Sequence, residues 1–571
     1  MTPPRHAFAP WETGDPMIVL LCDALSPEAA HGLAVLWETA GLAFGGRRMS
    51  TDSLADLPPD AVVLRYLPPQ DLKRMPRPGA ACLDIPLAGG DGEWEPRVHG
   101  LPSGETVTLP AAAFVGGDTG DAWPFDLFLA VHQLSTARWE IDAARRAERI
   151  DSWSVRTTPP PLDVPAVDLL ALWFKDRLAE TFASAGRPFL TVDRAPPGFT
   201  MSFLVALDFD TYGKDLLERA KQAHGVRRRV VNQLKAPGRN WRAALRTGWR
   251  EGLNLFKPGP YDRIPRVARW LEDQGLRGSF NIYVPYRSKA ETGWLWRLRQ
   301  KIYDPNYDIL KMPRYTAHFR DMMARGHEIG LQYGAFSSEG HPEDIALQAE
   351  ILDGAVGRRP RTGRHHFLKL NLATFADLLE RAGLGMDTSP AYLDASGFRL
   401  AAAGPVRGYN HGQRRSSEVI FVPTPLWDGV LTNGNSHDPT ETIETIVGAT
   451  ARVGGAMAAG IHPRSFGSTD FYGPHWPTFE ATLGAARRAG AWCVTAEAFF
   501  DWWTERAGIR ASRDGGDLIL PAPRGPMSFT LRQGDAIWTL ALHPDRPPRL
   551  DGPAGVAIRR AEPEYRLSGI R

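Results

Sequence analysis

Between residues 203 and 503, short apolar runs alternate with segments that have helical periodicity. The apolar runs are FLVALDFD, RGSFNIYV, EIGLQY, VIFVPT, AMAAGIH and AWCVTA, and the helical segments include YDRIPRVARWLEDQG, NLATFADLLERAG and TFEATLGAARRAG. A strand that is apolar on both faces needs cover on both sides, which a parallel sheet flanked by helices provides. Repetition of this unit about seven times predicts an α/β fold, specifically an incomplete or distorted (β/α) barrel.

The chain on either side of this region has a different pattern. At 571 residues the protein is too long for one ordinary core. We predict an N-terminal α/β domain at 1–195, the barrel at 196–507 and a small β-rich domain at 508–571. Candidate strands MIVLLC and AVVLRYL, with a helix opened by Ser26 and closed at Gly41, indicate the N-terminal domain. Alternating apolar residues around turn glycines predict antiparallel strands in the C-terminal one.

Composition narrows the class of protein. Hydrophobic residues make up 43% and charged residues 23%, as in soluble globular proteins, and the formal net charge of +2 indicates no particular partner. The three cysteines form no CxxC pair, which argues against a zinc knuckle or disulfide framework and favours a reducing compartment. No signal peptide, membrane span of ~18 apolar residues or nucleic-acid-binding module is recognisable. We therefore expect a cytoplasmic protein without a nucleic-acid partner.

The first candidate functional residues follow a buried strand in FLVALDFDTYG. Asp208 and Asp210 are two residues apart, so both side chains point to the same side at the carboxyl end of that strand. Two carboxylates this close repel each other unless a cation or a proton intervenes. Because catalytic groups collect at this end of a barrel, the pair is a candidate site. The alternative is that one aspartate caps a turn and the other is solvated.

Two further elements carry basic or imidazole side chains. In TGRHHFLKLN, Arg364 offers a rigid fork for a carboxylate, and His365 or His366 offers a neutral imidazole for a metal. The alternative is a surface basic cluster that caps the following helix, with Asn371 as its N-cap. His462 ends the apolar strand in GGAMAAGIHPRSFG, which suits a general acid or base, although a lone histidine is more often structural.

The order of these motifs resembles that of the polysaccharide deacetylases, the carbohydrate esterase family four barrel. The ordered set is DFD, then GHEIGL, then GRHH before a helix, then the late strand-end histidine, and it covers about residues 203–503. DLFLAVHQLSTARWE, the DPNYD stretch and an arginine-rich insertion also resemble one bacterial branch with an extra N-terminal α/β domain. The resemblance implies metal-assisted hydrolysis of N- or O-acetyl groups on an acetylated polysaccharide or oligosaccharide.

The resemblance also implies roles for individual residues. Asp208 matches the general base, Asp210 the carboxylate metal ligand and His462 the acid that protonates the leaving group. Arg364 matches the arginine that orients the catalytic aspartate. His366 stands where the branch with the extra domain has a histidine, so we expect it to serve as a replacement ligand.

The chain departs from the family at the two positions where metal-binding histidines are usual. Gln332 and Phe336 occupy them. Catalytic zinc takes about three nitrogen, sulfur or carboxylate ligands plus water, and a neutral amide is a poor substitute. Two hypotheses follow: a hydrolase with a rebuilt divalent-metal site, most simply zinc, or an inactive glycan-binding scaffold. In both we expect Gln332, Tyr333 and Trp427 to contact the sugar.

The insertion predicted at 213–258 contains a cationic amphipathic pattern. Within 226–257, tryptophan and leucine recur every four residues and arginines line a neighbouring face: Trp241, Leu245, Trp249, Leu253, Arg239, Arg242, Arg246 and Arg250. This pattern is compatible with peripheral contact to an anionic membrane or glycan. The alternative is a helix packed on the barrel with a solvated basic side.

Overall fold

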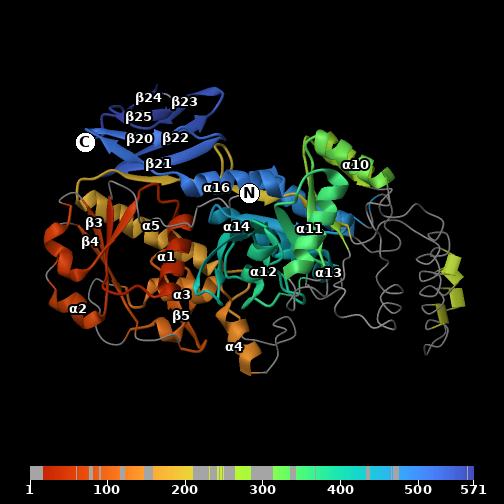
Figure 1. Ribbon diagram of the computed structural model, residues 1–571, viewed down its shortest axis with the longest axis horizontal. Helices are drawn as coiled ribbons and strands as arrows, with labels where there is room; N and C mark the ends of the chain where they lie inside the picture. Colours follow the sequence, from red (N-terminus) through yellow and green to blue (C-terminus); the bar gives the residue numbers. More distant parts are fainter. Residues whose placement is uncertain are drawn as a thin grey trace.

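The computed structural model describes residues 17–58, 61–75, 77, 81–88, 92–115, 123–146, 159–209, 230–231, 241–242, 245–246, 248–249, 264–284, 313–334, 342–366, 368, 370–432, 438–463, 466, 475–561 and 563–570. Within these segments the protein has a mixed α/β structure with parallel sheets, as the alternating pattern predicts. In Figure 1 the N-terminal elements lie below the C-terminal strands, and the helices of the central region extend to the right.

A parallel four-stranded sheet in the order β2-β1-β3-β4 forms the N-terminal part. Helix α1 (Pro27–Ala40) begins and ends where the sequence predicts, because Ser26 Oγ accepts from the Ala29 amide at 3.1 Å and Gly41 adopts a left-handed φ of 70°. The other elements of this part are β1 (Ile18–Leu21), β2 (Gly46–Met49), η1 (Thr51–Asp56), β3 (Val62–Leu67), α2 (Pro69–Arg74), β4 (Cys82–Pro86), β5 (Pro96–Gly100), β6 (Thr106–Pro110), η2 (Ala111–Ala113), α3 (Leu127–Ser135), α4 (Arg138–Arg146) and α5 (Ala166–Ser184).

The central region contains two sheets whose strands run parallel except at one edge. The first has the order β14-β15-β13-β12-β11-β10-β9, with β14 antiparallel to β15, and the second has the order β16-β17-β8-β18. The strands are β8 (Met201–Leu204), β9 (Ala206–Phe209), β10 (Ser279–Tyr283), β11 (Glu328–Tyr333), β12 (Thr362–His365), β13 (Met386–Asp387), β14 (Val406–Asn410), β15 (Arg415–Phe421), β16 (Leu426–Trp427), β17 (Ala456–Gly460) and β18 (Ala491–Val494). The Asp208 amide donates to the Ile461 carbonyl at 3.0 Å and thereby joins the end of β9 to the end of β17.

Helices connect these strands as the sequence predicts. Three of the predicted helical segments appear as α8 (Ile264–Asp273), α12 (Phe375–Ala382) and α15 (His475–Arg488). The other helices are α10 (Pro313–Ala324), α11 (Pro342–Val356), α13 (Asp428–Leu431), α14 (Pro439–Arg452) and α16 (Ala496–Gly508). The predicted N-cap of α12 is wrong by three residues: Thr374 occupies the cap, and Asn371 Oδ1 accepts from the Ala373 amide in the turn before it.

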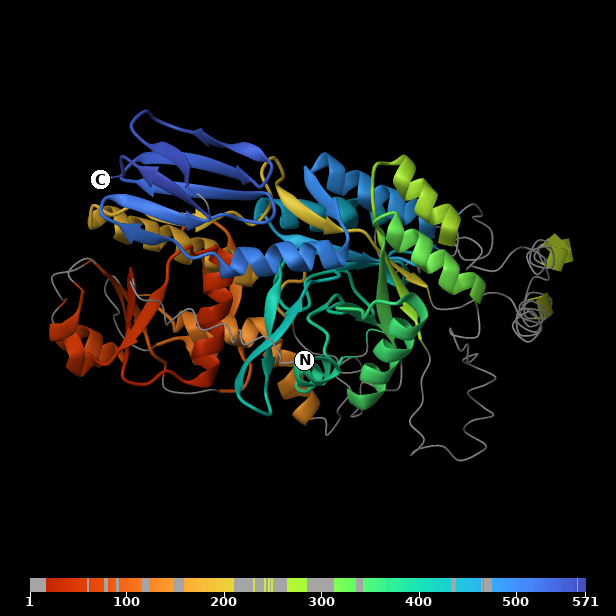
Figure 2. The same cartoon turned by 45° about the horizontal axis from the view of Figure 1, so that its top comes forward.

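Antiparallel strands follow α16 in the C-terminal part, in agreement with the alternating pattern there. They are β19 (Ser512–Asp514), β20 (Asp517–Pro521), β21 (Met527–Gln533), β22 (Ala536–His543), β23 (Arg546–Asp551), β24 (Ala557–Ala561) and β25 (Glu564–Ser568). One sheet has the order β23-β22-β21-β7, so it includes β7 (Phe189–Val192) from a distant part of the sequence. Figure 2 shows these strands stacked beside α5 and the N-terminal elements.

Buried polar contacts join the N-terminal part to the central region. Arg399 Nη2 donates to Glu140 Oε2 at 2.8 Å, and both side chains are buried. Arg407 Nε likewise donates to Glu38 Oε2 at 3.0 Å. These contacts and a shared apolar core fix one part against the other. Among the described helices, none combines the length and the apolar content that a membrane span requires.

Candidate active site

The site is built at the carboxyl ends of the central strands, beginning with Asp208 on β9. Asp208 is aligned with Asn281 on β10, which is aligned with Gly330 on β11. Asn281 Nδ2 donates to Asp208 Oδ1 at 2.9 Å. A Cβ atom at position 330 would lie 2.5 Å from Asn281 Oδ1, so the glycine gives the amide the room it needs beside the aspartate.

Arg364 on β12 holds the second oxygen of Asp208. Its Nη1 donates to Asp208 Oδ2 at 2.9 Å and to the Ala459 carbonyl at 3.2 Å. The arginine side chain is fully buried, as is His365 beside it. The alternative interpretation of TGRHHFLKLN as a surface basic cluster is therefore wrong for these two residues.

The guanidinium of Arg364 is fixed by two threonines. Nε donates to Thr388 Oγ1 at 3.0 Å and Nη2 to Thr424 Oγ1 at 3.3 Å. Thr424 Oγ1 in turn donates to the Thr388 carbonyl at 2.6 Å. Each of the three guanidinium nitrogens has a hydrogen-bond partner, so the arginine presents its charge to Asp208 in one orientation.

His462 lies just after β17 and is held by Asp428. The His462 amide donates to Asp428 Oδ2 at 2.7 Å, and His462 Nδ1 lies 3.0 Å from both carboxylate oxygens. A second imidazole reaches the same carboxylate, since His475 Nδ1 lies 2.7 Å from Asp428 Oδ2. With Nδ1 turned to the carboxylate, Nε2 of His462 is the nitrogen left to exchange a proton with a bound molecule.

Opposing effects set the pKa values of this pair. Burial lowers the pKa of His462, but the attraction and hydrogen bonding of Asp428, and then the charge of Asp208, outweigh it, so the pKa is raised above its ordinary value. Burial raises the pKa of Asp428, but His462 and His475 outweigh it and hold the pKa well below its usual range. Asp428 and His475 were missed in the sequence, although Asp428 directly follows β16 in LWDG.

The strand β11 places Gln332 inside the site and turns Tyr333 away from it. Gln332 is fully buried and aligned with Tyr283 on β10 and with Arg364 on β12. Tyr333 is also fully buried, and its hydroxyl donates to Asp387 Oδ2 at 2.6 Å. Burial raises the pKa of Asp387 to about 6, although the bonds from Tyr333 and Ser389 oppose the shift. The structure thus assigns Tyr333 to support of Asp387, without an exposed surface for a sugar.

The remaining candidate residues lie around this centre. His366 is half-buried, and its ring centroid lies 4.3 Å from that of Tyr283. Trp427 is also half-buried, and its Nε1 donates to the Tyr392 carbonyl at 2.9 Å. Asp210 and Phe336 lie outside the described residues.

The described side chains do not fit the expected zinc site. No group of three or more His, Cys, Asp or Glu side chains that could hold a metal ion occurs within the described segments. Both Asp208 oxygens accept hydrogen bonds from Asn281 and Arg364, and Gln332 offers a neutral amide where the resemblance expects imidazole. Of the two ligands that the resemblance implies, His366 belongs to the described residues and Asp210 does not.

No model of a known protein family matches the sequence, and no curated protein matches it. Two solved structures show a weak similarity to part of the chain. A probable polysaccharide deacetylase from Pseudomonas aeruginosa PAO1 is 13% identical with a TM-score of 0.32, and the match covers 55% of this chain and 93% of that protein. Puue allantoinase is 14% identical with a TM-score of 0.31, over 54% of this chain and 91% of the allantoinase. At this level of similarity we draw no function from either protein.

Proposed function

We propose that the chain is a polysaccharide deacetylase-like hydrolase that removes acetyl groups from a sugar polymer. The observation that carries this proposal is the clamping of Asp208 by Asn281 and Arg364 beside an Asp428-bound His462. One carboxylate and one imidazole, each fixed by its own partners at the same end of the strands, form an acid–base pair. The motif order in the sequence supports the same family.

The strand pairings support an incomplete barrel as the scaffold. Only Val205 separates β8 from β9, and β8 belongs to one sheet while β9 belongs to the other. In the same way, β15 and β16 are successive stretches of chain in different sheets. The chain therefore passes from one sheet to the other at two places. These two connections support a curved wall of strands with Asp208, Arg364 and His462 at one end.

The proposed reaction uses one residue as base and one as acid. Asp208 takes a proton from water while the water oxygen attacks the acetyl carbonyl carbon. The bond from that carbon to the sugar nitrogen or oxygen then breaks, and His462 gives its proton to the departing atom. The products are acetate and a free amine or hydroxyl. Arg364 acts as a positioning residue, because its hydrogen bonds hold Asp208 in one orientation.

A direct test measures acetate release by the full-length protein. The substrates are an N-acetylated and an O-acetylated oligosaccharide, and bound metal is measured on the same sample by elemental analysis. We expect acetate release from one of the two, abolished in His462→Asn and unchanged in His543→Asn, a histidine on the distant strand β22. No release from either substrate by the folded protein would refute the hydrolase proposal.

The alternative function is an inactive glycan-binding scaffold, and Gln332 is the observation that favours it. A neutral amide replaces an expected metal ligand, so in this function the site binds sugar without hydrolysing it. Calorimetry with the same oligosaccharides separates the two functions. Binding without acetate release, and with unchanged affinity in Asp208→Asn, would support the scaffold.

Peripheral membrane contact is a second proposal, which rests on exposed apolar side chains in the insertion. Its described residues, 230–231, 241–242, 245–246 and 248–249, all have helical backbone. Trp241, Leu245 and Trp249 are 57%, 63% and 75% exposed, and Arg242 and Arg246 lie next to the first two. Large apolar groups beside arginines suit the surface of an anionic bilayer.

Sedimentation with vesicles tests this contact. We expect the protein to sediment with phosphatidylserine-containing vesicles and to lose that binding in the double variant Arg242→Gln and Arg246→Gln. A double variant at Arg358 and Arg414, two exposed arginines elsewhere, serves as the control. Equal sedimentation of all three proteins, or none with wild type, would contradict membrane contact.

A further inference from the structure

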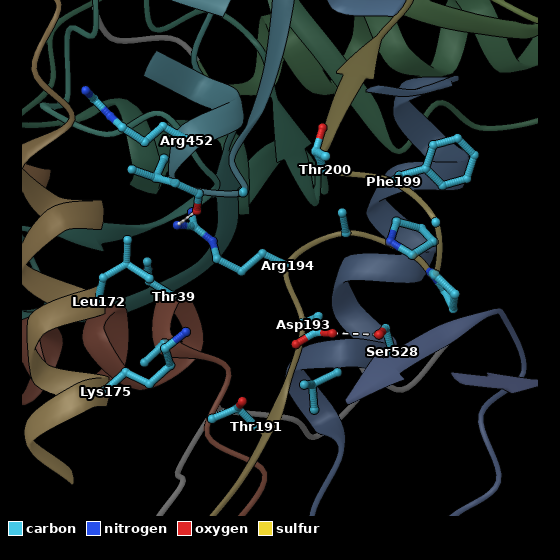
Figure 3. A pocket seen from close by; sticks show the side chains of 18 residues that line it. Thr39, Leu172, Lys175, Thr191, Asp193, Arg194, Phe199, Thr200, Arg452 and Ser528 are labelled. Atoms are coloured by element: carbon cyan, nitrogen blue, oxygen red, sulfur yellow. Dashed lines mark hydrogen bonds between the residues drawn. The ribbon is translucent and has the colours of Figure 1, made fainter. Parts of the chain in front are cut away.

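A cavity of about 320 Å³ lies away from the candidate active site, between the N-terminal part, the central strands and the C-terminal sheet (Figure 3). Its wall includes α5, the segment after β7, the turn after α14 and Ser528 on β21. Thr200 and Gly454, which precede β8 and β17, also line it. The cavity therefore lies at the amino ends of β8 and β17, whereas Asp208 is on β9, which follows β8 after Val205, and His462 lies just after β17.

Lys175 on α5 brings a positive charge to this cavity. Figure 3 shows its side chain directed into the space between α5 and the segment that carries Asp193 and Arg194. Within the described segments the Lys175 ammonium forms no hydrogen bond or ion pair. Burial lowers the pKa of Lys175, and the positive charges of Arg532 and Arg194 lower it further. The negative charges of Asp176 and Asp193 oppose this shift without reversing it. The protein thus holds an ammonium where its charge is disfavoured.

Arg194 adds a second cation with an unused donor. Its side chain is 9% exposed, and its two terminal nitrogens donate to the Val453 carbonyl at 2.8 Å and to Asp168. Its buried Nε has no hydrogen-bond partner among the described residues. A buried N–H without an acceptor is unfavourable, so an acceptor supplied by a ligand stabilises it.

The acidic side chain in the wall is already satisfied by hydroxyl groups. Asp193 Oδ2 accepts from Ser528 Oγ at 2.6 Å, and its Oδ1 accepts from Thr530 Oγ1 at 2.9 Å. The Asp193 carboxylate keeps its negative charge and acts on Lys175 from a distance, without a direct ion pair among the described residues. At the rim, Phe199 is 43% exposed and offers an apolar face of the kind on which a sugar ring can rest. The volume lies at the lower end of the range for small-molecule sites, about 300–1,000 Å³.

We infer that this cavity binds a small molecule of about monosaccharide size that carries an oxyanion, either a carboxylate or a phosphate, with the anionic group between Lys175 and Arg194. The anion forms the direct ion pair that Lys175 lacks among the described residues, and it supplies an acceptor for Arg194 Nε. The sugar hydroxyls face Thr191, Thr200 and the cavity backbone. This site is separate from the proposed acetyl hydrolysis and does not depend on it.

Calorimetry on the full-length protein tests the site with three probes of similar size: glucuronate, glucose 6-phosphate and neutral glucose. We expect one of the two anions to bind, and Lys175→Met to weaken that binding about tenfold, as loss of one charged hydrogen bond does. Lys175→Arg should retain most of the affinity. Lys73→Met, at an exposed lysine on α2, is the matched control and should leave binding unchanged.

The outcomes separate this site from the active site. Glucuronate as the better probe identifies a carboxylate ligand, and glucose 6-phosphate identifies a phosphate ligand. Asp208→Asn should leave the anion affinity unchanged, and Lys175→Met should leave acetate release unchanged. Binding of glucose as tight as that of the anions, no anion binding up to about 10 mM, or equal affinity in Lys175→Met and wild type would overturn the inference.

Discussion

Arg364 and Asp208 form a buried ion pair in which each partner depends on the other. Arg364 is fully buried and Asp208 is 5% exposed, so neither charge can regain water if its partner is removed. The two threonines at Arg364 and Asn281 at Asp208 supply the hydrogen bonds that such a pair needs to offset its desolvation. The same hydrogen bonds therefore fix the orientation of Asp208 and stabilise the fold around the buried ion pair.

Replacement of the buried arginine is expected to destabilise the fold. Arg364→Gln leaves Asp208 buried without its cation, and we expect the free energy of unfolding to fall by about 3–5 kcal/mol. Urea unfolding followed by circular dichroism measures the change. Arg358→Gln is the control, because Arg358 is 56% exposed in its pair with Glu497 and should lose less than about 1 kcal/mol. Equal losses in both variants would contradict the assigned role of Arg364.

The pair of His462 and Asp428 should make the protein pH-dependent. The raised pKa of His462 means that its stabilising contribution is complete below its ordinary pKa of about 6.5 and disappears as pH rises through the folded-state value. Asp428→Asn removes the attraction that raises this pKa. We therefore expect its loss of stability relative to wild type to be larger near pH 5.5 than near pH 9.

Nuclear magnetic resonance titration of His462 provides the direct measurement. The pKa should fall in Asp428→Asn, and the alkaline limb of the acetate-release profile should move to lower pH with it, since His462 donates its proton in the reaction. Asp438→Asn, at the N-cap of α14, is the control and should leave both unchanged. An unaltered His462 pKa in Asp428→Asn would show that another group controls this histidine.

A substitution at Gln332 tests whether this position faces a metal-binding site. Its backbone position is aligned with Tyr283 and Arg364, and an imidazole there would stand where the family resemblance expects a ligand. We expect Gln332→His to bind zinc at least about tenfold more tightly than wild type, because zinc prefers imidazole to a neutral amide. Calorimetric zinc titration measures this, with Gln70→His on exposed α2 as the control. Equal affinities would mean that residue 332 does not face a metal position.

At the scale of helices and strands, apolar periodicity predicts some elements and gives no sign of others. It predicts β10, β11 and β17, because each is buried throughout and has apolar residues among its side chains. It does not predict β12, whose sequence TGRH is polar yet completely buried. The Asp208 contact and the threonines satisfy Arg364, but those partners are distant in the sequence. A polar strand of this kind is recognisable only when its partners are known.

Strand β7 is the second element whose place could not be predicted. Its four residues are buried and pair with β21, about 340 residues later in the chain, and nothing local in the sequence indicates that partner. The predicted domain limits of 195 and 508 therefore separate two strands of one sheet. The sequence does not predict β7 as a strand, but the predicted antiparallel pairing of the C-terminal strands agrees with the structure.

This pairing predicts that β7 is essential to the C-terminal sheet. Leu190 is fully buried on β7 and faces Leu531 in the pairing register. We expect Leu190→Ala to lower the free energy of unfolding by about 2–5 kcal/mol, as loss of a buried leucine generally does. Ile537→Ala on β22 is the control, because Ile537 is 51% exposed and should change stability by less than about 1 kcal/mol. A Leu190→Ala protein as stable as the control would contradict the pairing.

Across the whole molecule, the candidate active site and the proposed anion site lie at opposite ends of the same strands. β8 and β17 begin near Thr200 and Gly454 at the cavity, and the chain reaches Asp208 on β9 and His462 just after β17 at the other end. The motif order in the sequence brought out Asp208, Arg364 and His462, because Asp208 and His462 stand at the ends of predicted strands and Arg364 stands in GRHH before a predicted helix. Asp428, Lys175 and Arg194 could not be found in this way, because their roles depend on packing between distant parts of the chain.

The most direct test of the account is the rate of acetate release by Asp208→Asn compared with wild type on the oligosaccharide that wild type deacetylates. Asparagine keeps the size of the side chain but cannot take a proton from water. We predict a loss of at least about a hundredfold, the usual contribution of a positioned base, while Asp535→Asn in the exposed turn between β21 and β22 keeps the wild-type rate. A folded Asp208→Asn protein that releases acetate as fast as wild type would contradict the assignment of Asp208 as the base.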